Sequence, residues 1–125
     1  MSEVFVFGSN LRGAHGKGAA LTARQHHGAI YGQGVGLQGQ SYAIPTKDER
    51  LRTLSIPEIE GYVYWFLVFA RERHDLTFRL TPIGCGLAGY THAQIGPLFR
   101  DAPSNVIIPD EFKPFASPSS RMTKD

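Results

Sequence analysis

The chain has 125 residues, of which 42% are hydrophobic and 19% charged, so its composition is that of one globular domain and excludes a disordered chain. Its net charge of +2 comes from scattered basic residues, and charge alone does not favour a nucleic-acid-binding protein. The single cysteine, Cys85, excludes an internal disulfide and a cysteine-rich zinc site. Because a single cysteine makes a reducing compartment the default and the longest apolar run, 62–70, is about half a membrane span, we expect a cytoplasmic protein with no membrane partner.

The N-terminal part predicts a strand, a glycine-rich loop and a helix. Residues 4–7 are β-branched or aromatic and are followed by Gly8, which is typical of a buried strand that ends at this glycine. The alanine-rich segment 18–27 predicts a short helix that packs closely on the sheet. Segment 31–40 contains four glycines and predicts neither a stable helix nor an uninterrupted strand.

The middle of the chain predicts a short strand, a polar loop and a long helix. Residues 41–45 form the strand and 46–50 the loop. Ser55 and Glu58 fit a capping box at the start of a helix over 56–73. The apolar positions of this helix form one stripe that we expect to face the sheet: Ile59, Val63, Phe66 and Ala70.

Strands and helices continue to alternate in the last third. Residues 76–81 alternate as a strand and lead into the glycine-rich loop 82–90. A short helix is expected from position 91 or 92 to position 99, followed by a buried strand over 105–108.

This pattern predicts the α/β class, with a single compact three-layer arrangement of a sheet flanked by helices. The domain is expected to cover residues 1–112. Residues 113–125 are rich in proline and serine and have no periodicity, which predicts a flexible C-terminal tail.

Three loops that are rich in glycine or charge leave the ends of predicted strands: 8–18, 46–50 and 83–90. In an open α/β sheet, ligands bind at the carboxyl ends of the strands. The three loops are therefore expected to line one crevice.

The first loop fails both common phosphate-binding patterns. A nucleoside-triphosphate loop needs a lysine directly after its second glycine, but Ala14 follows Gly13. The dinucleotide pattern begins at Gly16 but has Leu21 in place of its third glycine. Two interpretations remain: a cradle that holds a diphosphate at a helix N-terminus without a metal, or a tight turn whose glycines only permit close packing.

Three short motifs, in order along the chain, resemble those of macro domains, the α/β fold that binds ADP-ribose. Residues 10–21 (NLRGAHGKGAAL) resemble the asparagine and glycine-rich loop of that family. Pro45-Thr46-Lys47 is similar to an element with a catalytic lysine, and residues 83–87 (IGCGL) are similar to the loop around the diphosphate and distal ribose. The resemblance covers about residues 3–110.

The resemblance implies a macro-domain-like sheet and a ligand that is ADP-ribose or a related NAD-derived nucleotide. It is nearest to the branch that removes ADP-ribose from DNA bases or acidic side chains, in which the lysine attacks the anomeric carbon of the distal ribose. It therefore makes Lys47 the candidate catalytic residue and ADP-ribosylated DNA or protein the candidate partners. The candidate ligand-binding residues are Asn10, His15, Gly16, Lys17, Gly18, Gly84, Cys85, Gly86, Leu87, Ala88, Gly89 and Tyr90.

The chain departs from the family at two places. Ala88 stands where relatives that cleave ester-linked ADP-ribose have an aspartate, and the N-terminal aspartate that reads adenine is missing. A hydrolase, a non-catalytic binding module and an unrelated domain with structural glycines all remain as alternatives. A nucleophilic lysine must be neutral, and Asp48 or Glu49 would oppose this if either faced Lys47.

No cofactor or metal is expected, because the adjacent His26 and His27 would diverge on a helix.

Overall fold

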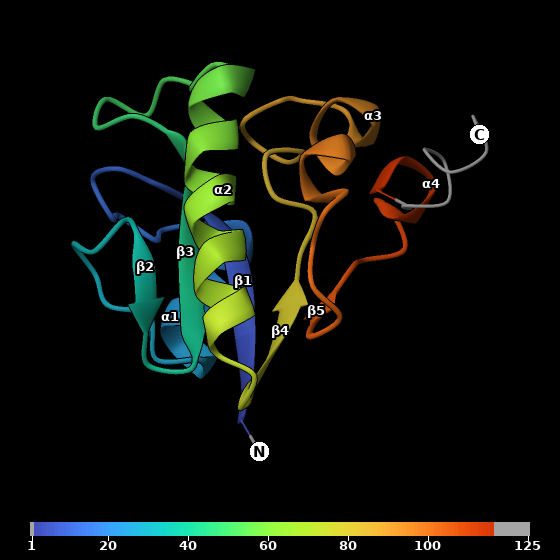
Figure 1. Ribbon diagram of the computed structural model, residues 1–125. Helices are drawn as coiled ribbons and strands as arrows, with labels where there is room; N and C mark the ends of the chain where they lie inside the picture. The colour runs from blue at the N-terminus through green and yellow to red at the C-terminus, as the bar shows by residue number, and fades with distance from the viewer. Residues whose placement is uncertain (1, 117–125) are drawn as a thin grey trace.

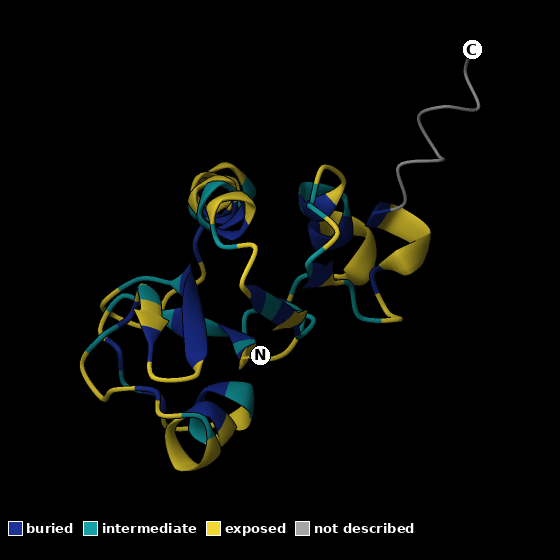
Figure 2. Cartoon of the chain, turned by 60° about the horizontal axis from the view of Figure 1, so that its bottom comes forward, coloured by how far each residue is buried: buried dark blue, intermediate teal, exposed yellow. Residues whose placement is uncertain are grey.

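The computed structural model describes residues 2–116 and shows an α/β fold with a five-stranded mixed sheet and helices on both of its faces (Figures 1 and 2). The strand order is β2-β3-β1-β4-β5. In chain order the elements are β1 (Ser2–Asn10), α1 (Gly18–His26), β2 (Gly36–Gln38), β3 (Ser41–Lys47), α2 (Ile56–Glu72), β4 (Leu76–Leu80), α3 (His92–Ile95), the 3-10 helix η1 (Gly96–Phe99), β5 (Val106–Ile107) and α4 (Lys113–Ala116).

β1 lies at the centre of the sheet, parallel to β3 on one side and to β4 on the other. β5 is parallel to β4, and the short edge strand β2 is antiparallel to β3. The expectation that the first strand ends at Gly8 is wrong, because the pairing with β3 continues to Asn10, which lies opposite Lys47. A Cβ at position 8 would lie 3.4 Å from the Cβ of Ile83, so Gly8 lies directly beside the exit of β4.

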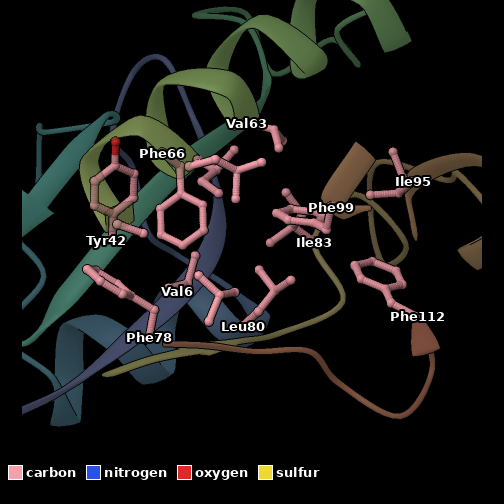
Figure 3. Close-up of a cluster of buried hydrophobic side chains, with 14 of the residues drawn as sticks. Val6, Tyr42, Val63, Phe66, Phe78, Leu80, Ile83, Ile95, Phe99 and Phe112 are labelled. Atoms are coloured by element: carbon pink, nitrogen blue, oxygen red, sulfur yellow. The ribbon is translucent and has the colours of Figure 1, made fainter. Parts of the chain in front are cut away.

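The main core lies between the sheet and α2 (Figure 3). The predicted stripe of α2 is confirmed: Ile59, Val63, Phe66 and Ala70 are all buried, and the Phe66 ring packs edge-on against Phe78 of β4. A smaller cluster lies under α1 on the opposite face, where alanines allow the helix to approach the sheet: Phe7, Ala20, Ala23, Ala29 and Ala43.

Local signals place the helix starts correctly. The Ser55–Glu58 capping box is present in full, and Thr91 forms a second capping box with Gln94 at the start of α3. Among the described residues, no helix is both long and apolar enough to cross a membrane.

The C-terminal prediction needs a correction at its first four residues. Lys113–Ala116 form α4, and Ala116 is 4% exposed. α4 packs on η1, since a Cβ added to Gly96 would lie only 2.8 Å from the Cβ of Phe115. The rest of the predicted tail, 117–125, lies outside the described residues.

Candidate functional site

A cleft of about 790 Å³ lies at the carboxyl ends of β1, β3 and β4. It is lined from the three predicted loops, so the expectation that they share one crevice is confirmed. Most of the predicted site residues line it: Asn10, Gly16, Lys17, Gly18, Lys47, Gly84, Cys85, Gly86, Leu87 and Ala88. His15, Gly89 and Tyr90 do not.

His15 has a structural position below the cleft and is fully buried. Its Nε2 lies 2.9 Å from the carbonyl oxygen of Gln33 and 3.2 Å from Oε1 of Gln38. Because both partners are acceptors, Nε2 carries the proton and donates. The edge of the ring meets Phe7, and Nδ1 has no hydrogen-bond partner within the described part of the chain. His15 therefore links the loop after β1, to which it belongs, with Gln33 in the loop before β2 and with Gln38 in β2.

Tyr90 and Gly89 shape the β4 loop from outside the cleft. The Tyr90 hydroxyl donates to the carbonyl oxygen of Leu54 at 2.7 Å. The backbone N–H of Tyr90 donates to the carbonyl oxygen of Gly84 at 2.9 Å. Gly89 has a φ of +91°, which favours glycine in the turn between these anchors. Both residues therefore position the cleft wall.

The glycines of the first loop differ in how closely other atoms approach them. A Cβ on Gly13 would fall on the backbone of Gly32 and Gln33, so Gly13 permits close packing. A Cβ on Gly16 would have no atom nearer than 3.8 Å, and one on Gly18 would meet nothing within 4 Å. The backbone of the second half of the loop is therefore free of close packing at Gly16 and Gly18.

The N-terminus of α1 opens into the cleft. Lys17 is the N-cap residue, and no side chain caps the helix or places an acidic group in its first turn. Gly18, Ala19 and Ala20 line the cleft, and the first N–H bonded within the helix is that of Leu21, to Lys17. This end of the helix thus offers unpaired N–H donors and the positive end of its dipole.

The side chains left free in the cleft are mainly donors and cations. Three lining hydroxyls donate inward to backbone carbonyls: Ser9 to Gly34, Thr46 to Ser9 and Thr81 to Val6. Asn10 Oδ1 accepts the N–H of Ala14 at 3.1 Å, which leaves its Nδ2 for a ligand. The titratable groups of the lining are Lys17, Lys47, Cys85 and His92. No aspartate or glutamate of the described residues is among them.

Lys47 lies half-buried at the end of β3, beside Asn10. The neighbouring Asp48 accepts the N–H groups of Arg50 at 2.8 Å and Arg52 at 2.9 Å, and the Arg52 side chain at 3.1 Å. The backbone N–H of Arg52 is the main cause that lowers the pKa of the Asp48 carboxyl below its ordinary value of 3.8. Lys47 has no ion pair within residues 2–116, so Asp48 does not neutralise it.

Cys85 has the properties of a packing thiol. Its Sγ lies 3.4 Å from the carbonyl oxygen of Ile83. Burial, and less strongly the charge of Glu111, raises the pKa of this thiol above its ordinary value of 9.0. A thiol with a raised pKa is a poor nucleophile at neutral pH.

Six lining residues lie outside the three predicted loops: Ala19, Ala20, Leu51, Thr81, Pro82 and His92. The sequence predicts a helix start at position 91 or 92 and gives His92 no role in the site, although its position just after the glycine-rich loop is a usable signal. Leu51 gave no signal, because its backbone conformation depends on the fold of its loop.

Comparison of the chain with protein-family models, with curated proteins and with solved structures finds no match in any of the three. Within the described residues, no group of three or more His, Cys, Asp or Glu side chains is placed to hold a metal ion.

Proposed function

We propose that the cleft binds ADP-ribose or a closely related NAD-derived nucleotide. One observation carries the proposal: the cleft combines an uncapped helix N-terminus, Lys17 and Lys47 with a lining that has no carboxylate among the described residues. Such a lining attracts an anion and repels no part of it. Its volume of about 790 Å³ lies in the range of pockets that enclose small-molecule ligands.

The diphosphate is proposed to lie between the N-terminus of α1 and the 84–88 loop. The distal ribose then lies toward Asn10 and Lys47, which are neighbours at the ends of β1 and β3. Asn10 Nδ2 and Lys47 Nζ are both donors, which suits the oxygen-rich surface of a ribose. The resemblance of the three motifs to macro domains supports the same orientation.

Calorimetric titration with ADP-ribose tests the binding. We expect saturable binding that Lys17→Ala weakens about fivefold, because one exposed charge-assisted contact contributes about 1 kcal/mol. Lys113→Ala is the matched control, since Lys113 is an exposed lysine outside the cleft that pairs with Asp110. Asn10→Asp keeps the oxygen that caps Ala14 while it removes the Nδ2 donor, and it should also weaken binding. Absence of binding at millimolar ADP-ribose would refute the proposal.

A second candidate function is hydrolysis of ADP-ribosyl linkages on a nucleobase or a protein. The observation that favours it is the position of Lys47, which lines the cleft while the adjacent carboxylate of Asp48 binds its own loop. In this reaction Nζ of Lys47 attacks the anomeric carbon, and the acceptor leaves with the bonding electrons and takes up a proton. The amine loses its protons as the sugar ring opens to an imine, and water then releases ADP-ribose and restores the amine.

Borohydride trapping distinguishes the hydrolase from the binding module. Incubation with ADP-ribosylated DNA or ester-linked ADP-ribosyl protein, followed by reduction, should add one ADP-ribosyl group to Lys47 in a peptide mass map. The Lys47→Met variant should not turn over the substrate and should not form the adduct. The Lys113→Met variant should turn over the substrate and form the adduct as the wild type does. Binding of ADP-ribose without turnover of either substrate would identify the non-catalytic module.

A further inference from the structure

Two exposed leucines stand at the cleft, on different loops. Leu51 is 41% exposed and Leu87 is 69% exposed. Several other large apolar side chains of residues 2–116 are exposed, but of these exposed side chains only Leu51 and Leu87 line the cleft. An apolar pair in a cleft whose free polar groups are donors suits a ligand that is apolar at one end.

Leu51 is held in an unfavourable backbone conformation. Its φ is +63°, in the left-handed region that strains residues other than glycine, and to a lesser degree asparagine and aspartate. The turn around Asp48 imposes this conformation: the Asp48 carboxylate binds the N–H groups on both sides of Leu51, and the Leu51 N–H donates to the Asp48 carbonyl oxygen at 3.0 Å. A strained residue that glycine could replace points to a role for its side chain.

The two loops that carry the leucines are fastened to each other. The Thr53 hydroxyl donates to the carbonyl oxygen of Ala88 at 3.0 Å, next to Leu87. Tyr90 donates from the same loop to Leu54 at 2.7 Å. Thr53 is also bridged to Lys47, so the leucine pair has a fixed relation to the lysine. The apolar rim is therefore built before any ligand arrives.

We propose that Leu51 and Leu87 form the subsite for the nucleobase of the bound nucleotide, an inference that rests on the proposed function. A nucleotide matches the anionic and apolar parts of the cleft. Its diphosphate suits Lys17 and the N-terminus of α1, and its flat base suits the two leucines. The subsite holds the base by apolar contact and does not read its polar edges, since both side chains are hydrocarbon. Such a subsite discriminates only weakly between different bases.

The test compares ligands that have and lack a base. Wild type, Leu51→Ser and Leu87→Ser are titrated with ADP-ribose and with ribose 5-phosphate. Each substitution should weaken ADP-ribose binding about fivefold, because it withdraws part of one leucine side chain from contact with the base. Binding of ribose 5-phosphate should stay the same. The hypoxanthine analogue of ADP-ribose should bind the wild type within about threefold of ADP-ribose, since only the edge of the base differs.

Two further variants separate a ligand role from a structural one. Leu37→Ser is the matched control, because Leu37 is 39% exposed and lies outside the cleft, and it should leave ADP-ribose affinity unchanged. Leu51→Gly relieves the backbone strain but adds conformational entropy to the unfolded chain, so it should change Tm by no more than about 2 °C while it weakens ADP-ribose binding.

The outcomes distinguish this inference from the proposed function. If wild type binds ADP-ribose and both serine variants bind it equally well, the subsite is refuted and the proposed function stands. Equal losses for ADP-ribose and ribose 5-phosphate refute the subsite as well. If wild type does not bind ADP-ribose, both proposals are refuted.

Discussion

Gly34→Ala tests how the glycine-rich segment before β2 supports the cleft. A Cβ at position 34 would collide with the carbonyl oxygen of Asn10 and lie 3.1 Å from the carbonyl carbons of Asn10 and Leu11. These are backbone atoms at the end of β1 and cannot rotate away. The substitution must therefore move either the end of β1 or the loop that packs beneath it.

The expected loss of stability has two parts. Overpacking against a rigid neighbour costs about 1–3 kcal/mol. Movement of residue 34 also strains the buried hydrogen bond from the Ser9 hydroxyl to the Gly34 carbonyl, which adds about 1–2 kcal/mol. The free energy of unfolding should fall by about 2–5 kcal/mol and Tm by about 8–20 °C.

Thermal unfolding followed by circular dichroism measures the stability, and titration with ADP-ribose measures the site. Binding should weaken together with Tm, because the displaced backbone is that of Asn10. Gly86→Ala is the stability control, since a Cβ there meets nothing within 4 Å, and its Tm should stay within about 2 °C of wild type. If the Gly34→Ala and Gly86→Ala variants have the same Tm, the contact between Gly34 and the backbone of Asn10 does not hold the end of β1 in place.

Two further predictions concern stability alone. Gly61→Ala, at an exposed position within α2 where a Cβ meets nothing, should raise the free energy of unfolding by about 1 kcal/mol, and an unchanged Tm would contradict this. Acid should destabilise the fold, because hydrogen bonds lower the pKa values of Glu3 and Asp48 below their ordinary 4.5 and 3.8. The carboxyl groups of Glu3 and Asp48 therefore have lower pKa values in the folded protein than in the unfolded chain. Their contribution to the free energy of unfolding is present above the ordinary pKa values and is lost as the pH falls below them through the lowered values. A Tm that does not fall between pH 5 and pH 3 would refute this account.

Local patterns predicted the elements that depend on neighbouring residues. The Ser55–Glu58 capping box and the apolar stripe of α2 involve contacts within one or two helical turns, so the sequence contains the whole signal. The convergence of three loops was also predictable, because parallel strands end at the same edge of a sheet. These two kinds of inference were sufficient to place Asn10, Lys17 and Lys47 in one cleft.

The errors arose where a residue's role depends on distant segments. Gly8 looked like a strand end, but the pairing with β3 carries β1 through Gly8 to Asn10. His15 looked like a cleft residue, but its acceptors at positions 33 and 38 lie 18 and 23 residues further along the chain. The four residues of α4 looked like a tail because their packing partner, Gly96, belongs to another element.

The turn around Asp48 connects the two halves of the proposed site. Its carboxylate binds the Arg50 and Arg52 N–H groups, and this keeps the charge of Asp48 away from Lys47 while it holds Leu51 in its strained conformation. The cationic and apolar parts of one wall are thus positioned by the same group. A ligand that contacts both parts loses little binding free energy to ordering them, because the fold already sets their spacing. Loss of this turn, as in Asp48→Ala, should therefore weaken contacts to the base and to the distal ribose together, whereas Leu51→Ser should weaken only the contact to the base.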